Sequence, residues 1–224
     1  MKIGILQTGR AHEAIAAAHG EVDLWFHALL DGNDFEFETW MVVDGDLPDG
    51  PEAADGWLIT GSKHGAYEDH PWIPPLEALI RAIHTADRPL VGICFGHQII
   101  AQALGGRVEK FAGGWAIGQQ TYQTPEGELT LNAWHQDQVT KLPPGAQRLA
   151  SNGFCENAIL AYGKRVLTVQ AHPEFSEDFT ADMLRHRTDT VPADVVRGAE
   201  ARNGSSNDNA VLAQMLSETL RGAT

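Results

Sequence analysis

The sequence predicts an α/β fold in which a mostly parallel sheet is flanked by helices and carries a small antiparallel β extension. Three observations support this prediction. Short apolar runs alternate with helix-like segments over the first hundred or so residues. Several of these runs end in glycine-containing turns, and after Gly105-Gly106 the pattern changes to short alternating segments. Alternating strands and helices are typical of a parallel sheet that is covered on both faces.

The N-terminal part of the chain predicts two strands separated by a helical region. Residues 2–7 form an apolar run that ends at the turn signal Thr8-Gly9-Arg10, as expected for a buried strand. Residues 11–30 favour helix, with a break at Gly20. Residues 35–43 alternate and are rich in β-forming side chains, which indicates a second strand.

A strand, a helix and another strand are expected next. Residues 56–60 are a short apolar run that enters the turn Gly61-Ser62. Residues 72–86 carry apolar side chains at helical spacing, with prolines in the first turn. Residues 89–93 form the strand that leads to a conspicuous glycine-flanked cysteine.

The second half of the chain predicts short strands followed by helices. The expected strands are 107–110, 119–123, 128–134, 147–150, 158–162 and 166–170. The expected helices are 176–187, 193–201 and 209–220, with a flexible link at 203–207.

The bulk composition predicts one globular domain, residues 1–224, with ample length for a hydrophobic core. Because the net charge is −14 and lysines and arginines are not clustered, we expect neither nucleic acid nor a membrane surface as partner. No stretch approaches the ~20 apolar residues that a membrane span needs. Two cysteines make no disulfide framework, so a cytoplasmic location with free thiols is expected.

The segment Gly92-Ile93-Cys94-Phe95-Gly96-His97-Gln98 is the strongest functional signal. A cysteine between two glycines, where a strand turns into a helix, is the thiol form of a nucleophile elbow. The flanking positions must be small because the chain folds back on itself, and the helix N-terminus favours a thiolate. This pattern predicts an enzyme that attacks a carbonyl group through Cys94.

A thiol nucleophile needs a base, and the segment Gln170-Ala171-His172-Pro173-Glu174-Phe175 offers one. In an extended segment, His172 and Glu174 would share a face, and the carboxylate would fix the tautomer of the imidazole. A surface loop is the alternative for this segment alone. Together with the upstream cysteine, it predicts a Cys94-His172-Glu174 triad.

The remaining cysteine and histidines carry weaker signals. Cys155 has no elbow and no helix start, so we expect a passive thiol. His64 and His70 follow Gly61 and either line the site or lie exposed in a loop. We see no metal-ligand spacing, P-loop or dinucleotide fingerprint, so neither a metal nor a cofactor is expected.

Three motifs in order, the elbow, Trp134-His135-Gln136-Asp137 and the segment ending in Phe175, resemble those of the class I (triad-type) glutamine amidotransferases. The resemblance runs from about Met1 to Phe175. It implies a flavodoxin-like amidotransferase fold. The elbow and the turn at Gly61-Ser62 resemble a stand-alone subgroup that includes γ-glutamyl peptidases, and the motifs are also similar to GMP-synthase-type amidotransferase domains.

The resemblance also implies catalytic roles. Cys94 would attack the side-chain amide of glutamine and form a γ-glutamyl thioester. His172 would activate the thiol and protonate the leaving ammonia, oriented by Glu174. The backbone N–H groups of Gly61 and Phe95 would form the oxyanion hole.

The substrate contacts are implied in the same way. Gln98 and the segment His135, Gln136 and Asp137 match positions that hold the amino-acid end of glutamine. Independently, a glutamine site needs an acid for the ammonium and polar donors for the carboxylate, and these residues supply both. A solvated turn is the alternative for 135–137. Ala116 stands where the family often has a glutamate.

Several functions stay open from the sequence. The first is hydrolysis of glutamine or another γ-glutamyl amide, with a γ-glutamyl peptidase as its close alternative. The ammonia would be released or passed to a synthase subunit in trans, because residues 176–224 are too few for an ATP-using acceptor domain. A non-catalytic binding or regulatory protein is a further alternative, as is the related thiol-dependent fold of the DJ-1/PfpI type.

Overall fold

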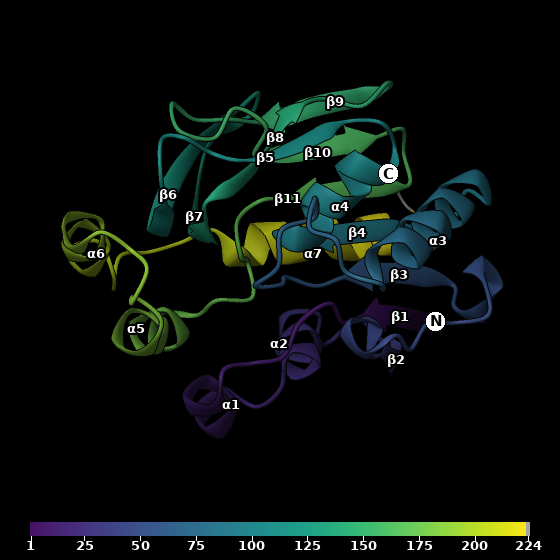
Figure 1. Ribbon diagram of the computed structural model, residues 1–224, viewed down its shortest axis with the longest axis horizontal. Helices are drawn as coiled ribbons and strands as arrows, with labels where there is room; N and C mark the ends of the chain where they lie inside the picture. The colour runs from purple at the N-terminus through teal and green to yellow at the C-terminus, as the bar shows by residue number, and fades with distance from the viewer. Residues whose placement is uncertain (223–224) are drawn as a thin grey trace.

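The computed structural model describes residues 1–222, and a seven-stranded sheet forms its centre (Figure 1). The strands are β1 (Lys2–Leu6), β2 (Glu36–Trp40), β3 (Gly56–Ile59), β4 (Leu90–Ile93), β9 (Ala146–Ala150), β10 (Ile159–Tyr162) and β11 (Val166–Val169). Their order across the sheet is β2-β1-β3-β4-β11-β10-β9. The first five run parallel, and β10 and β9 add an antiparallel edge. The predicted α/β class with a mostly parallel sheet is confirmed.

The three central strands β3, β4 and β11 contain only buried residues. Such continuous apolar runs are expected where helices cover both faces of a parallel sheet. The one polar side chain among them, Thr168, is satisfied because its Oγ1 lies 2.8 Å from Nδ1 of His97. These strands therefore form a rigid frame for the loops at their carboxyl ends.

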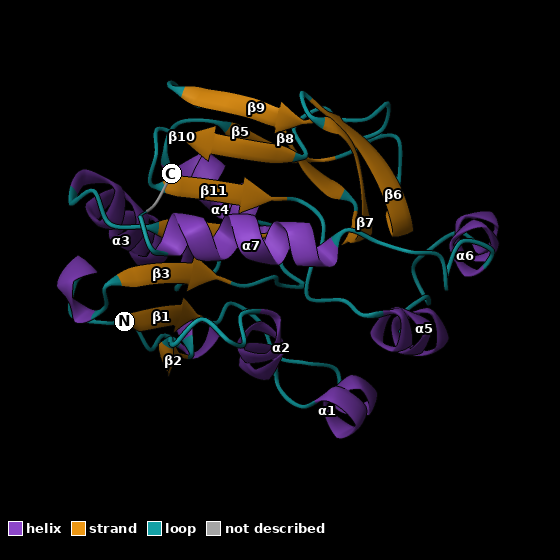
Figure 2. Cartoon of the chain, turned by 180° about the vertical axis from the view of Figure 1, so that it is seen from behind, coloured by secondary structure: helices purple, strands orange, loops and turns teal. Residues whose placement is uncertain are grey.

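Helices cover the two faces of the sheet (Figures 1 and 2). The α-helices are α1 (Glu13–His19), α2 (Val22–Leu29), α3 (Ile73–Thr85), α4 (Phe95–Ala103), α5 (Glu177–His186), α6 (Ala193–Glu200) and α7 (Asn209–Leu220), and short 3₁₀ turns occupy Val42–Asp44 and Pro51–Ala53. On one face, α3 and α4 bury Leu76 and Ile100. On the other, α2 and α7 bury Phe26 and Leu216. Among residues 1–222, no helix combines the length and apolarity that crossing a membrane requires.

Two separate two-stranded antiparallel sheets form the antiparallel extension. In one, β5 (Arg107–Lys110) pairs with β8 (Asp137–Lys141), and in the other, β6 (Ala116–Thr124) pairs with β7 (Gly127–His135). The helix α6 packs on β6, and α1 packs on α5. Figure 2 shows α1, α5 and α6 beyond the end toward which the arrows of β1, β3 and β11 point. This end of the sheet is where the functional loops of an open α/β fold are expected.

Two details differ from the sequence predictions. The strand predicted over residues 35–43 ends at Trp40, because the chain then turns into the 3₁₀ helix Val42–Asp44 and buries Val42. β8 was not predicted, since its pairing with β5 depends on a distant segment rather than on local alternation. The predicted helix break at Gly20 is confirmed, with φ of 76°.

Candidate active site

Cys94 lies between β4 and α4 in a strained backbone conformation. Its φ is 53° and its ψ is −101°, a combination that costs about 1–3 kcal/mol in a residue with a side chain. The sharp turn needs its glycines, because a Cβ on Gly92 would lie 2.6 Å from the carbonyl of Gly96, and one on Gly96 would overlap the carbonyl of Ile59. The Cys94 N–H donates to the carbonyl of Val169 over 2.8 Å. The chain therefore makes the strand-to-helix turn that its sequence predicts.

The thiol of Cys94 is only slightly exposed and faces polar groups. Its Sγ lies 3.9 Å from the carbonyl oxygen of Trp134 and 3.8 Å from Nε2 of Gln170. The sulfur also sits at the N-terminus of α4. A nearby N–H donor and the positive end of a helix both stabilise negative charge that develops on the sulfur.

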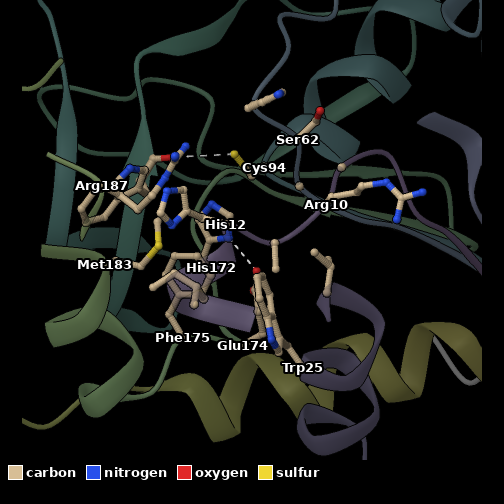
Figure 3. A pocket seen from close by; sticks show the side chains of 17 residues that line it. Arg10, His12, Trp25, Ser62, Cys94, His172, Glu174, Phe175, Met183 and Arg187 are labelled. Atoms are coloured by element: carbon tan, nitrogen blue, oxygen red, sulfur yellow. Dashed lines mark hydrogen bonds and ion pairs between the residues drawn. The ribbon is translucent and has the colours of Figure 1, made fainter. Parts of the chain in front are cut away.

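The imidazole of His172 lies between the thiol of Cys94 and the carboxylate of Glu174 (Figure 3). Its Nδ1 is 2.6 Å from Oε1 of Glu174, and the ring stacks on Phe175 at a centroid distance of 4.1 Å. The predicted extended conformation is wrong here. The Phe175 N–H donates to the carbonyl of His172 over 3.2 Å, so residues 172–175 form a β-turn with Pro173 at its second position.

Two charges control the protonation of His172. Burial of the ring opposes its protonation, but the negative charges of Glu174 and of the Cys94 thiolate outweigh this effect and raise the pKa of His172 to about 10. Since the Glu174 side chain is only 2% exposed, water screens this charge little. The arrangement favours an imidazolium beside the sulfur at neutral pH.

Gly61 lies against both of these side chains. A Cβ at this position would be 3.2 Å from Cε1 of His172 and 3.7 Å from Cβ of Cys94. The carbonyl of Thr60 is held by the N–H of Gly96 over 3.1 Å. Because a trans peptide directs its N–H opposite to its carbonyl, the Gly61 N–H points away from that bond. Within residues 1–222, neither it nor the Phe95 N–H donates to a protein acceptor.

A cavity of about 310 Å³ opens on one side of Cys94, and we call it the Asp137 cavity. Its wall brings together all four substrate-contact residues that the sequence indicated, namely Gln98, His135, Gln136 and Asp137. It also holds charges of both signs, since Lys110 and Glu68 line it as well. Such a wall suits a zwitterionic amino-acid group.

The hydrogen bonds of these residues refine their expected roles. The Gln98 amide N–H groups donate to the carbonyl of Asp137 over 2.9 Å and to Gln170 over 3.1 Å, which leaves its Oε1 rather than a donor for a ligand. His135 is neutral, because burial lowers its pKa to about 4. The Asp137 carboxylate accepts from the hydroxyl of Tyr67 over 3.2 Å, and burial raises its pKa.

A second cavity also borders Cys94 (Figure 3), and we call it the Trp25 cavity. It measures about 140 Å³, and Gly61, His172 and Glu174 lie in its wall. Lys63 and Arg187 line both cavities. Sequence reasoning did not single out these cations or Tyr67, because only the fold brings their segments to Cys94.

The loop after β3 gathers three potential metal ligands, although their spacing gave no such signal. One ligand atom each from His64, Glu68 and His70 lies within 4.8 Å of the others. The Glu68 carboxylate is 2.7 Å from Nε2 of His70 and 3.4 Å from Nδ1 of His64. These contacts satisfy the three side chains among themselves, and the expectation of no metal stays a prediction.

Cys155, unlike Cys94, has no positive φ and does not precede a helix. It is buried, and burial raises the pKa of its thiol to about 12. It forms no disulfide with Cys94. Its environment therefore favours the passive thiol that the sequence predicts.

The fold and this arrangement define the class of protein: an α/β protein that presents a thiol at a strained strand-to-helix turn beside an imidazole–carboxylate pair. Residues 51–188 match the family model described as glutamine amidotransferase class-I. The chain belongs to the class-I glutamine amidotransferase family.

Individual relatives agree with this family. The chain is 31% identical over 175 residues to γ-glutamyl peptidase 4 of Arabidopsis thaliana, covering 71% of this chain and 70% of the relative. It is 32% identical over 176 residues to a glutamine-hydrolysing GMP synthase of Burkholderia mallei, covering 67% of this chain but 32% of the relative. These relatives support a general amidotransferase or hydrolase function.

A solved structure supports the fold. A glutamine amidotransferase from Methylobacillus flagellatus superposes with a TM-score of 0.75 at 22% identity, covering 99% of this chain and 93% of that one.

Proposed function

We propose that the protein hydrolyses the γ-amide of glutamine, or of another γ-glutamyl compound, through a thioester on Cys94. One observation carries the proposal. The buried His172–Glu174 pair, with 2.6 Å between Nδ1 and Oε1, lies beside a thiol held on a strained turn between two cavities. The relatives described above include γ-glutamyl peptidases and a glutamine-hydrolysing synthase.

The chemistry follows from the charges. The thiolate of Cys94 attacks the amide carbon, and the carbonyl oxygen takes up negative charge. His172, protonated at neutral pH, gives its Nε2 proton to the amide nitrogen as the carbon–nitrogen bond breaks. The amine leaves, and a γ-glutamyl thioester remains. Water then attacks the thioester, His172 takes a proton from it, and glutamate is released with Cys94 restored.

Two free backbone donors stabilise the oxyanion in this scheme. The N–H groups of Gly61 and Phe95 are the expected donors, since neither has a protein acceptor within residues 1–222. Each preorganised donor of this kind lowers a barrier by about 3–4 kcal/mol. The hydroxyls of Thr8 and Thr60 support the Gly61 segment, because both donate to the Gly61 carbonyl, over 3.2 and 3.1 Å.

The amino-acid end of the substrate occupies the Asp137 cavity. Asp137 faces the ammonium, and Lys110, which lines this cavity but not the Trp25 cavity, provides a partner for the carboxylate. Gln98 accepts from the ammonium through its free Oε1. His135 and Gln136 shape the wall of the cavity, and a buried neutral imidazole contributes no charge to it.

A second candidate is the transfer of the ammonia to a synthase subunit in trans. The similarity to a GMP synthase favours this transfer, since the match covers only 32% of the length of that synthase. Co-purification from the native source would detect such a partner, and the chemistry at Cys94 would be the same.

The proposal is tested by following glutamate release from glutamine and from γ-glutamyl peptides. Cys94→Ala should abolish release, whereas Cys155→Ala should keep it because Cys155 lines neither of the two cavities that border Cys94. Absence of turnover with every compound, in protein whose Cys94 thiol still titrates, would refute the proposal. Equal loss in both variants would also contradict it.

A further inference from the structure

The part of the Trp25 cavity that lies beyond Gly61, His172 and Glu174 has no assigned task in the hydrolysis of glutamine itself. The cavity shares five lining residues with the Asp137 cavity, namely Ser62, Lys63, Cys94, Trp134 and Arg187. The lining residues that it does not share include Arg10 and His12 before α1, Trp25 of α2 and Met183 of α5 (Figure 3). The side chains that distinguish its wall are Arg10, His12, Ile15, Trp25, Phe175 and Met183.

The position of the acid determines which group of a substrate enters this cavity. Nδ1 of His172 is engaged by Glu174, so Nε2 delivers the proton to the departing nitrogen. His172 and Glu174 lie in the wall of the Trp25 cavity and not of the Asp137 cavity. A proton donor must lie within hydrogen-bond reach of the nitrogen that it protonates. The departing amine therefore faces the Trp25 cavity while the glutamyl end lies in the Asp137 cavity.

The size of the cavity exceeds what ammonia needs. A water-sized molecule needs roughly 10–15 Å³, and this cavity has about 140 Å³. Ammonia is such a molecule, so glutamine would leave most of the space to solvent. A leaving amine that carries a side chain would fill it.

The wall shows which kind of side chain fits. Trp25 and Phe175 meet edge to face at 6.3 Å, and Met183 and Ile15 add apolar surface. The indole N–H of Trp25 donates to the carbonyls of His19 and Gly20, so Trp25 has no free hydrogen-bond donor for a ligand in the cavity. An apolar group is the ligand that such a wall stabilises.

Cations lie at the edge of this apolar wall. Arg10 pairs with Asp44, whereas Lys63 and Arg187 have no acidic partner among residues 1–222. In a chain with net charge −14, exposed unpaired cations beside a cavity are a distinctive feature. They suit the carboxylate of an amino acid.

We propose that the Trp25 cavity binds the leaving group, and that the preferred substrates are γ-glutamyl amides of amino acids with apolar side chains. This inference rests on the proposed hydrolysis at Cys94. In the acylation step, the Cys94 sulfur–carbon bond forms and the carbon–nitrogen bond breaks. The nitrogen takes its proton from His172, and the free amino acid leaves through the Trp25 cavity.

A substrate series tests this assignment in the wild-type protein. We compare kcat/KM for glutamine, γ-glutamylleucine and γ-glutamylisopentylamide, which has the leucine side chain but no carboxylate. We expect γ-glutamylleucine to exceed glutamine by at least about tenfold, the value of burying one leucine side chain. The isopentylamide should fall between them.

A variant localises the effect. Met183→Glu places a negative charge in the cavity, so the ratio of kcat/KM for γ-glutamylleucine to that for glutamine should fall by about tenfold. Arg185→Glu is the matched control, because Arg185 is exposed on the same helix and does not line the cavity, and it should leave the ratio unchanged.

The outcomes separate the two proposals. Turnover of glutamine without any gain from the leucine side chain overturns the leaving-group assignment and leaves the hydrolysis intact. A gain that Met183→Glu does not reduce overturns the assignment to this cavity. No turnover of any compound refutes the hydrolysis itself, and the assignment with it.

Discussion

Nδ1 of His172 lies 2.6 Å from Oε1 of Glu174, and the two side chains are 8% and 2% exposed. The pair is built by a β-turn around Pro173 and is anchored by the His172 N–H, which donates to the carbonyl of Asn132 over 2.7 Å. This contact directs Nε2 toward Cys94. It also supplies the negative charge that keeps the ring protonated.

Glu174→Gln tests this electrostatic role. Glu174 raises the pKa of His172 toward about 10, so removing its charge lowers that pKa. The alkaline fall of kcat, which we expect near pH 10 in the wild type, should move to lower pH. kcat itself should fall by about 10²–10⁴-fold. Glu126→Gln, in the exposed turn between β6 and β7, is the control, and an unmoved alkaline limb in Glu174→Gln would contradict the role.

Gly61→Ala tests the close approach at the proposed oxyanion hole. The new Cβ would press on His172 at 3.2 Å and on Cys94 at 3.7 Å. Displacement of reacting groups by about 1 Å costs about 10²-fold in rate, so kcat should fall strongly while the melting temperature changes little. Gly153→Ala is matched, because a Cβ there meets nothing within 4 Å. Wild-type kcat in Gly61→Ala would exclude the arrangement.

Asp137→Asn tests the binding of the substrate ammonium. Because this end of glutamine is remote from the scissile bond, we expect KM to rise by at least about tenfold with little change in kcat. A glutamine analogue without the α-amino group should be hydrolysed equally by variant and wild type. Asp69→Asn, in the exposed loop nearby, is the control. If Asp137→Asn raises KM for the analogue as much as it raises KM for glutamine, Asp137 does not bind the ammonium.

Two buried histidines predict a loss of stability in acid. Burial, aided by a neighbouring imidazole, lowers the pKa of His97 to about 3 and of His135 to about 4, from 6.5. Below pH 6.5 the unfolded chain binds protons that the folded protein excludes, so the free energy of unfolding falls by about 1.4 kcal/mol per pH unit for each group. His172 adds no slope there, because its raised pKa keeps it protonated in the folded protein and the unfolded chain is protonated as well.

Urea unfolding between pH 6.5 and pH 4 measures this slope. His97→Asn should lower the slope of the free energy of unfolding against pH by the equivalent of about one proton taken up on unfolding. His84→Asn, in the exposed last turn of α3, should keep the wild-type slope. Identical slopes in all three proteins would contradict the assignment to His97.

The sequence predicted those parts of the site that local sterics determine. Gly92 and Gly96 predict the turn at Cys94, because a Cβ on Gly92 would clash with Gly96 and a Cβ on Gly96 would clash with Ile59. The contact between His172 and Glu174 was expected from an extended segment. It is also made in the turn, because side chains two positions apart can meet in either conformation. The turn itself was missed, since Pro173 is compatible with both conformations.

Contacts between distant segments were not predictable. The amide of Gln98 turns its N–H groups toward the Asp137 carbonyl and Gln170, which are 39 and 72 positions away. Trp25 and Arg187 line the same cavity as Cys94, although they are 69 and 93 positions away from it in the sequence. The family resemblance runs only to about residue 175, so it implied no role for the side chains of α5, although a helix was predicted over residues 176–187.

The most direct test of the central claim is to trap the acyl intermediate. Acid quenching during turnover of a γ-glutamyl substrate, followed by peptide mapping by mass spectrometry, should locate one γ-glutamyl group on the peptide that contains Cys94. The Cys155 peptide should stay unmodified, and Cys94→Ala should carry no label. Turnover with an unmodified Cys94, or a label on any other residue, would contradict catalysis through this thiol.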